Sequence, residues 1–152
     1  MDKYDIQILH ELQLDGRLSN RDLAERISLS PAPCWRRVKR LQDEGVIESY
    51  SARINQKKVG LQVIAFAEVT LENHHPETIE KFLERVHQNK EILECHSVTG
   101  QCDYLLKIVS GDMEAYEQFL SSQLLVLRGV RSVSTLISMR QNKLTGELPI
   151  TG

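Results

Sequence analysis

Residues 30–45 read SPAPCWRRVKRLQDEG and combine a helix start, a helix stop and the densest positive charge in the sequence. Ser30 is a favourable N-cap residue, because its hydroxyl can accept a hydrogen bond from a backbone N–H of the first turn. Pro31 suits the first helical position, where its missing N–H costs nothing, and Gly45 readily takes the left-handed conformation that ends a helix. The stretch therefore predicts a helix whose two ends are both encoded locally.

The two sides of this predicted helix differ in character. At 100° per residue, Cys34, Val38 and Leu41 fall on one narrow apolar stripe. The opposite side carries Ala32, Arg36, Lys39, Arg40 and Asp43. Four of the five residues from 36 to 40 are Lys or Arg, in a chain whose net charge is −2. By itself this pattern fits a solvated helix face as well as a face that binds an anionic partner.

The two segments before this helix complete a helix-turn-helix pattern. Residues 2–14 place apolar side chains at the three- and four-residue spacings of a helix with one buried side. Residues 19–22, SNRD, form an S-x-x-D capping box that opens a short helix ending near Ser28. Only Leu29 and Ser30 then precede the basic helix, which suits the angled turn of a helix-turn-helix. This spacing favours DNA as the anionic partner.

The chain after the basic helix predicts a wing, a linker and a second domain. Residues 46–54 alternate short apolar runs with polar residues, as in a small β-hairpin. Residues 55–60, NQKKVG, are polar and punctuated by glycine, as in a connection between domains. We therefore expect a DNA-binding domain at 1–54, a linker at 55–61 and a second domain at 62–152.

The second domain alternates between strand and helix periodicities. Apolar residues recur at every second position in its strand segments and at three- and four-residue intervals in its helical segments. The expected elements are a strand at 63–71, a helix from Pro76, strands at 92–99 and 104–109, a helix from about Asp112, and a strand at 130–139. This βαββαβ order predicts a ferredoxin-like, four-stranded antiparallel sheet with both helices on one face. The fold class is thus α+β.

One face of that sheet would lack a covering layer. Ile64, Phe66, Leu106 and Leu136 are apolar residues of the strands, too many to leave exposed to water. Burial against a second copy of the chain is the simplest remedy, so we expect a homo-oligomer.

Composition and charge bound the class of protein. The chain has 152 residues, 41% of them hydrophobic and 26% charged, as is ordinary for globular proteins. It contains no apolar run long enough to span a membrane, and its start, MDKYD, lacks the order of a signal peptide. We therefore expect a cytoplasmic protein. Residues 1–60 hold 11 Lys and Arg against 9 Asp and Glu, whereas residues 61–152 hold 8 against 12, which suggests two modules with different partners.

The cysteines and histidines predict neither a metal site, nor a cofactor, nor a catalytic centre. Cys34, Cys95 and Cys102 are odd in number and lack CxxC spacing, so we expect reduced thiols. The five histidines are scattered and form no pattern of ligands or catalytic acids. They are His10, His74, His75, His87 and His96.

Four motifs together resemble the Lrp/AsnC, or feast/famine, family of transcriptional regulators. They are Asp5-x-x-Ile8-Leu9, Asp15-Gly16-Arg17, SLSPAPCWRRVKRLQDEGVI at 28–47 and VTGQCDY at 98–104. Each motif alone is modest, but their order and separations are specific, and they span nearly the whole chain. The resemblance implies a winged helix-turn-helix that binds double-stranded DNA, dimers paired through their C-terminal sheets, and often four dimers joined in an octameric ring.

The resemblance also implies a small effector, usually an amino acid, bound between neighbouring dimers. The corresponding effector-binding residues here are Thr99, Gly100, Gln101, Cys102, Asp103, Tyr104, Ser134 and Thr135. Backbone N–H groups of a glycine turn suit an α-carboxylate, and the Asp103 carboxylate suits an α-ammonium group. The alternative is that GQCD is only a hairpin turn.

In a helix-turn-helix, the N-terminal half of the basic helix enters the major groove. The side chains placed to reach base edges are Ala32, Trp35, Arg36 and Arg40, with Arg36 the first candidate for reading guanine. Those placed for the DNA backbone are Ser19, Asn20, Ser30, Arg37, Lys39, Arg53, Lys57 and Lys58. Trp35 departs from the smaller residues of the family pattern, and core packing is as compatible with its position as groove contact.

Two alternative functions remain at this point. The same assembly could be an architectural DNA-binding protein that responds to no effector. Some proteins that resemble this family are tetrapyrrole decarboxylases, but the scattered histidines and the basic helix favour a DNA-binding regulator over an enzyme.

Overall fold

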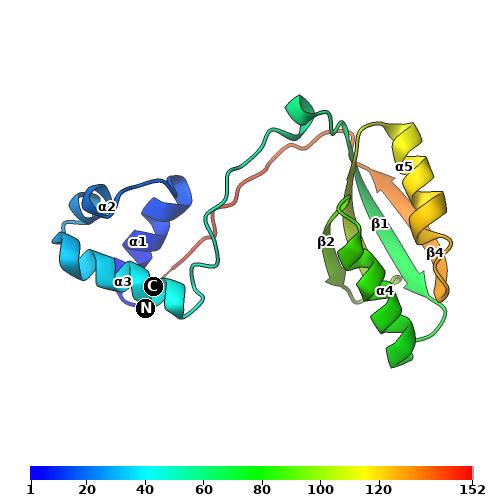
Figure 1. The fold of residues 1–152 in the computed structure, drawn as a ribbon, viewed down its shortest axis with the longest axis horizontal. Helices are drawn as coiled ribbons and strands as arrows, with labels where there is room; N and C mark the ends of the chain where they lie inside the picture. The colour runs from blue at the N-terminus through cyan, green and yellow to red at the C-terminus, as the bar shows by residue number, and fades with distance from the viewer. Residues whose placement is uncertain (152) are drawn as a thin grey trace. The chain divides into compact units, whose positions relative to one another are not determined.

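The computed structural model describes residues 1–151, which form two compact units (Figure 1). The first unit contains residues 1–53 and 142–151, and the second contains residues 54–141. The domain prediction differs at the C-terminal end, because it assigned the last residues of the chain to the second domain. Their contacts lie with the first unit instead.

The first unit is built from three helices, as expected for a helix-turn-helix. They are α1 at Lys3–Leu14, α2 at Asn20–Arg26 and α3 at Pro31–Asp43. Ile8, Leu23 and Leu41 are fully buried where the three helices meet, and Cys34 of the predicted apolar stripe joins them. The three-helix arrangement predicted from the spacing of apolar residues is therefore confirmed.

The helix ends follow the predictions only in part. Gly45 has a φ of +71° and ends α3 as expected. Ser30 occupies the N-cap position, but among the described residues its side chain makes no capping hydrogen bond. At α2 the Ser19 hydroxyl accepts the Asp22 N–H, yet it donates to the Asp22 carboxylate, so the expected box is only half formed. A complete capping box, not predicted from the sequence, joins Asp2 and Asp5 at α1.

The hairpin predicted for residues 46–54 is wrong: in the described part of the chain this segment contains no strand. The N–H groups of Val46 and Ile47 both donate to the Leu41 carbonyl, which closes the end of α3. Farther along, the Arg53 guanidinium donates to the Leu144 carbonyl oxygen at 3.0 Å. The segment thus contacts the C-terminal residues instead of pairing with itself.

The C-terminal residues are held by side chains of α1. The amide of Gln13 both donates to the Leu148 carbonyl and accepts the Leu148 N–H. His10 Nε2 lies 3.3 Å from the Ile150 carbonyl oxygen, and the Ile150 side chain packs against the core of the three helices. These contacts explain why the last residues belong to the first unit.

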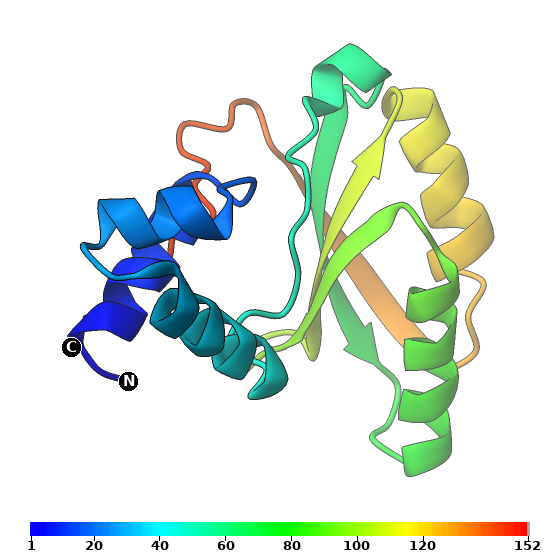
Figure 2. The same cartoon turned by 60° about the vertical axis from the view of Figure 1, so that its left-hand side comes forward.

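The second unit has the predicted βαββαβ order. Its elements are β1 at Val63–Leu71, α4 at Pro76–Gln88, β2 at Ile92–Ser97, β3 at Tyr104–Ser110, α5 at Met113–Phe119 and β4 at Val130–Ile137. The strands form an antiparallel sheet in the order β2-β3-β1-β4. Both helices lie on one face of this sheet (Figure 2). A π-helical turn at Leu120–Leu124, which the sequence pattern does not predict, follows α5.

The two faces of the sheet differ sharply in burial. Ala65, Ala67 and Val69 of β1 are fully buried beneath the helices. Leu106 also faces the helices and is fully buried, so it does not belong to the uncovered face. The uncovered face carries the partly or largely exposed apolar side chains of Ile64, Phe66, Leu105 and Leu136, whereas Val109 on the same face is only 4% exposed. Within residues 1–151, no helix has the length and apolar character needed to cross a membrane.

Gly129, just before β4, offers a test of this packing. A Cβ at this position would lie 2.4 Å from Thr78 Cγ2, and Gly129 has a φ of +94°. Thr78 cannot easily move away, because its hydroxyl donates to Asn73 Oδ1. We expect Gly129→Ala to lower the free energy of unfolding by about 2–4 kcal/mol, from backbone strain and overpacking together. Urea unfolding followed by circular dichroism at fixed protein concentration measures it.

Gly60→Ala is the matched control, since Gly60 has a φ of +87° and no described atom lies within 4 Å of its Cβ position. Gly60→Ala should lower the free energy of unfolding only by the contribution of backbone strain, about 1–2 kcal/mol. Equal losses in the two variants would contradict the close contact between Gly129 and Thr78.

Candidate nucleic-acid interface and ligand site

The exposed side of α3 is the candidate nucleic-acid interface. Its exposed residues include all four that the sequence predicts to face base edges, Ala32, Trp35, Arg36 and Arg40. Arg36 forms no ion pair or side-chain hydrogen bond with any residue in the described chain. Its guanidinium is therefore free to bind an external acceptor.

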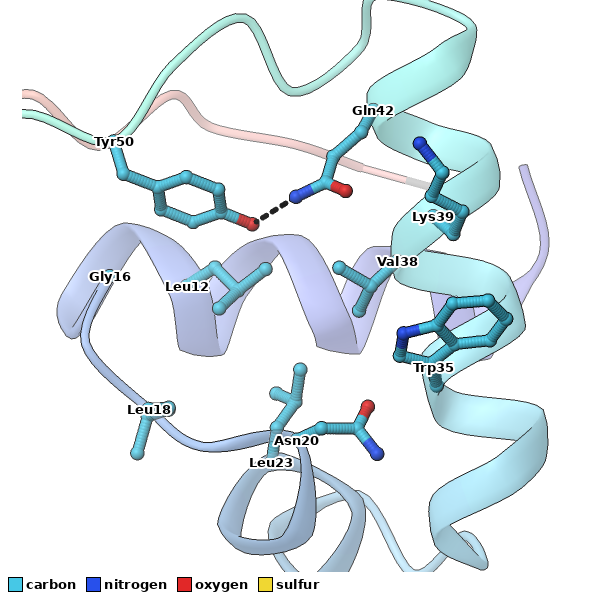
Figure 3. A pocket seen from close by; sticks show the side chains of 10 residues that line it. All are labelled: Leu12, Gly16, Leu18, Asn20, Leu23, Trp35, Val38, Lys39, Gln42 and Tyr50. Carbon is cyan, nitrogen blue, oxygen red and sulfur yellow. Dashed lines mark hydrogen bonds between the residues drawn. The ribbon is translucent and has the colours of Figure 1, made fainter.

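The structure decides the orientation of Trp35, which is 58% exposed and outside the core. The indole lines a cavity of about 250 Å³, next to Val38 of α3 and across from Leu12 and Leu23 (Figure 3). The predicted alternative of core packing is thus wrong. An exposed indole on α3 can contact a bound nucleic acid directly.

Three cations of α3 are engaged inside the first unit. Arg37 Nη1 lies 2.8 Å from both Asp2 Oδ2 and Asp5 Oδ1, and the guanidinium sits 5.5 Å from the centre of the Tyr4 ring. Hydrogen bonds to Asp2 and then to Asp5 raise the pKa of Arg37 above its ordinary value. Arg37 is thereby held against α1, away from the exposed position that the sequence suggested for a phosphate contact.

Arg40 and Lys39 differ in how firmly they are held. Arg40 Nη2 lies 2.7 Å from the buried Asp5 carboxylate, although half of the Arg40 side chain is exposed. Lys39 pairs with Asp43 at 2.7 Å, but both side chains are more than half exposed. Such surface pairs contribute little to stability and exchange readily for other partners. Lys39 is therefore available to an anion, whereas Arg40 keeps the buried Asp5 as a partner and also has its Nε 3.8 Å from the exposed Glu44 carboxylate.

Sequence reasoning missed Asp5, although it contained a signal. Asp5 lies on the same helical stripe as Ile8 and Leu9, and a carboxylate on a buried stripe requires a partner. Burial opposes its ionisation, but the hydrogen bond from Asp2 and the contacts with Arg37 and Arg40 outweigh burial and lower the pKa of Asp5. The group is therefore ionised at neutral pH.

The other predicted backbone contacts are dispersed. The Ser19 hydroxyl is occupied by Asp22, and the Asn20 amide donates to the Pro31 carbonyl at 2.9 Å, which ties α2 to the start of α3. Ser30 is exposed at the N-terminus of α3. Lys57 and Lys58 are exposed on a 3-10 turn at Gln56–Val59, which belongs to the second unit. Arg53 is exposed and contacts Leu144 as described above.

The turn between β2 and β3 is the candidate ligand site. Thr99, Gly100 and Gln101 are exposed at its tip, and Cys102 is partly buried. Gly100 has a φ of +126° and leaves open space around its α-carbon within the described structure. The tip therefore exposes backbone groups that a small ligand can reach.

Asp103 anchors this turn to the rest of the unit. Its Oδ2 accepts the Leu71 N–H at 2.7 Å and its Oδ1 lies 2.7 Å from His74 Nε2. Its own N–H donates to the Val69 carbonyl. The hydrogen bond with His74 and then that with Leu71 lower the pKa of Asp103. Both carboxylate oxygens thus have partners within the unit and Asp103 anchors the turn, while its direct contact with an α-ammonium group stays a prediction.

Tyr104 and Thr135 do not present their side chains to a ligand at the tip. The Tyr104 ring is buried with its centre 4.7 Å from that of Phe82. The Thr135 hydroxyl lies 2.7 Å from the Tyr116 hydroxyl, on the helix side of the sheet. Ser134 faces the opposite side, opposite Glu68 of β1. The eight predicted effector residues therefore do not form one surface of a single chain.

The described residues contain no group of three or more His, Cys, Asp or Glu side chains that could hold a metal ion. The three cysteines are free thiols, with Cys34 buried and Cys95 and Cys102 partly buried. Burial raises the pKa of the Cys34 and Cys95 thiols.

Two family models match the two units of the chain. A model described as winged helix-turn-helix DNA-binding matches residues 1–48, and a model of the Lrp/AsnC ligand binding domain matches residues 64–148. The leucine-responsive regulatory protein of Klebsiella pneumoniae is 42% identical over 150 residues, which covers 99% of this chain and 92% of that protein.

Solved structures agree with these matches. A transcriptional regulator from Neisseria meningitidis, in complex with L-Met, superposes with a TM-score of 0.94 at 38% identity, over 98% of this chain and 96% of that one. An AsnC family transcriptional regulator from Agrobacterium tumefaciens gives a TM-score of 0.93 at 36% identity, over 98% of this chain and 97% of that one. The whole architecture is thus shared, including the order of the two units.

The anchor at Asp103 predicts a pH-dependent loss of stability. Asp103→Asn removes the charge that binds His74 and the Leu71 N–H, so the free energy of unfolding should fall by about 1–2 kcal/mol at pH 7. A carboxyl group whose pKa is lowered by folding stabilises the protein above its unfolded pKa and loses that effect as the pH falls through its folded pKa. The difference between wild type and variant should therefore shrink below the ordinary pKa of 3.8.

Urea titrations at pH 7 and pH 3, followed by circular dichroism, measure this difference. Thr99→Ala, at the exposed tip of the same turn, serves as the control and should change stability little at either pH. A loss for Asp103→Asn of the same size at both pH values would contradict the assignment of the charged carboxylate as the anchor.

Proposed function

The chain belongs to the Lrp/AsnC family of transcriptional regulators, and we propose that α3 reads an operator while the turn at residues 99–104 takes part in binding an amino acid. The first unit carries the helix-turn-helix DNA-binding match and the second carries the ligand-binding match. Membership of a family of transcriptional regulators decides against the tetrapyrrole decarboxylase alternative. We infer a cytoplasmic location, where its DNA target is found.

The observation that carries the proposal for DNA is the contrast between Arg36 and its neighbours. Arg36 is exposed without a partner in the described chain, whereas Arg37 and Arg40 are tied to α1. A free guanidinium can donate two hydrogen bonds to the N7 and O6 atoms of guanine in the major groove. Ala32 and Trp35 lie on the same exposed side and would contact bases or sugars beside it.

Lys39, Arg53, Lys57 and Lys58 are exposed cations suited to phosphates, which set affinity more than sequence preference. Ser19 and Asn20 support this interface through the contacts they make within the unit. Ser30 can bind a phosphate through its free hydroxyl and the backbone at the start of α3.

Self-association completes the proposed mechanism. The uncovered sheet face carries Ile64, Phe66, Leu105 and Leu136, and the Leu136 side chain is 54% exposed. Pairing two such faces buries these side chains and brings two copies of α3 into one particle, as recognition of paired half-sites requires. Dimers could then associate further into an octamer, the larger assembly that the family resemblance implies.

An apolar amino acid is the proposed effector. The Neisseria regulator was solved with L-Met, and the Klebsiella relative is a leucine-responsive protein. The exposed tip at Thr99, Gly100 and Gln101 offers backbone groups for an α-carboxylate. Cys102 lies next to this tip. Ser134 and Thr135 would enter the site only where a neighbouring dimer brings its own β4 close to the turn.

Substitution of Arg36 tests the proposed reading of DNA. Sites selected from a random duplex library supply the cognate sequence, and the single Trp35 of α3 reports binding by fluorescence. Arg36→Ala should cost about 1–3 kcal/mol on the selected duplex and relax the base preference. Lys58→Ala, the control, should weaken binding to selected and scrambled duplexes alike. Equal losses on both duplexes for Arg36→Ala would remove Arg36 from the base contacts.

A ligand screen separates the regulator from the architectural alternative. Ligands that bind only the folded state raise the unfolding temperature by mass action. We expect methionine, leucine or a similar apolar amino acid to raise the midpoint of thermal unfolding and to change affinity for the selected duplex. If none of the twenty amino acids shifts the midpoint, the architectural function is favoured.

A further inference from the structure

We propose that Asp5 of α1 is a positioning residue for DNA recognition, which fixes the directions of Arg37 and Arg40 on α3 and withholds part of their charge from non-specific contacts. The inference rests on the proposed binding of DNA by α3. It assigns a role to a residue that itself lies out of reach of DNA, since Asp5 is only 1% exposed.

The contacts of Asp5 use both of its carboxylate oxygens. Oδ1 lies 2.8 Å from Arg37 Nη1, and Oδ2 lies 2.7 Å from Arg40 Nη2. Oδ2 also accepts the N–H of Asp2 at 2.9 Å, as part of the capping box of α1. One buried carboxylate thus joins the first turn of α1 to two guanidinium groups of α3.

Arg37 and Arg40 both contact the buried Asp5 carboxylate, while part of each side chain stays accessible to solvent. Side-chain exposure is 27% for Arg37 and 48% for Arg40. Arg37 is further restrained by Asp2 and by the Tyr4 ring. Arg40 Nε lies 3.8 Å from the exposed Glu44 carboxylate, and the N–H groups of Nη1, which pair with no acidic group in the described chain, can donate toward DNA. The contact with Asp5 of α1 therefore positions the Arg40 guanidinium in the protein without DNA.

This arrangement divides the cations of α3 into two classes. Arg36 and Lys39 are adjustable, because Arg36 has no partner in the described residues and Lys39 has only an exposed one. Arg37 and Arg40 are fixed. A fixed guanidinium loses less conformational entropy on binding and tolerates fewer misplaced acceptors, so it favours one register of the helix in the groove.

The negative charge of Asp5 has a second consequence. Non-specific affinity for DNA depends on the number of phosphates that cations neutralise. The slope of the logarithm of the binding constant against the logarithm of the salt concentration steepens by about 0.9 for each additional phosphate. Asp5, Arg37 and Arg40 together carry a net charge of +1, in place of the +2 of two free arginines. Asp5 therefore lowers non-specific affinity while it preserves geometry.

The test compares Asp5→Asn with Asp43→Asn, which makes the same change of charge. Asp43 is exposed and pairs only with Lys39 on the surface of α3. Dissociation constants for the selected and the scrambled duplex are measured at several salt concentrations. Trp35 fluorescence and the unfolding midpoint verify that each variant is folded at the temperature of measurement.

Asp5→Asn should reduce the ratio of the scrambled to the selected dissociation constant by about tenfold. It should also tighten binding to the scrambled duplex and steepen its salt dependence. Asp43→Asn should tighten both duplexes similarly and leave the ratio within about twofold. A ratio that changes equally in both variants would overturn the inference, because charge alone would then account for the effect.

Arg40→Lys provides a second route if Asp5→Asn does not fold. Lysine keeps the charge but cannot bridge Asp5 and DNA with the planar fork of arginine. For Arg40→Lys, the ratio of the scrambled to the selected dissociation constant should fall about tenfold, with little change in affinity for the scrambled duplex. An unchanged ratio would overturn the inference. If the wild-type protein binds no duplex, the proposed function fails together with this inference. If wild type discriminates and these variants do so equally well, only the role of Asp5 fails.

Discussion

The buried carboxylate of Asp5 is the contact on which the exposed surface of α3 depends. An ionised group inside a helical core is tolerated only when its oxygens are fully bonded. Here the bonds come from Arg37 and Arg40 on α3 and from the first turn of α1. The requirement that stabilises the fold therefore also determines which cations of α3 face outward freely, and Arg36 and Lys39 are left as the adjustable ones.

A comparable anchor organises the second unit. Asp103 bonds the β2–β3 turn to the end of β1 and to His74 before α4. The tip of the turn can then expose its backbone without losing its position. In both units a carboxylate stabilises the local structure, although the sequence pattern assigned Asp5 no role and predicted Asp103 only as a ligand contact.

The element order was predictable because its signals are local. Helical spacing, the proline at the start of α3 and the glycine after it give the bounds of that helix within two residues. Two-residue alternation locates β1 and β4 equally well. The hairpin at 46–54 was predicted wrongly, because alternation indicates a strand only where a pairing partner exists. That segment instead closes α3 and contacts Leu144.

The sequence by itself determined the two-unit organisation, the basic helix and the βαββαβ order, since each rests on residues within a few positions of one another. Only the tertiary structure decided that Trp35 is exposed, that Arg37 is braced and that Asp103 is already bonded. Arg37 and Asp5 are 32 positions apart, as are Leu71 and Asp103. Contacts across such distances leave no periodic signal in the chain, so which polar groups remain free for a partner becomes known only when the helices and strands are packed.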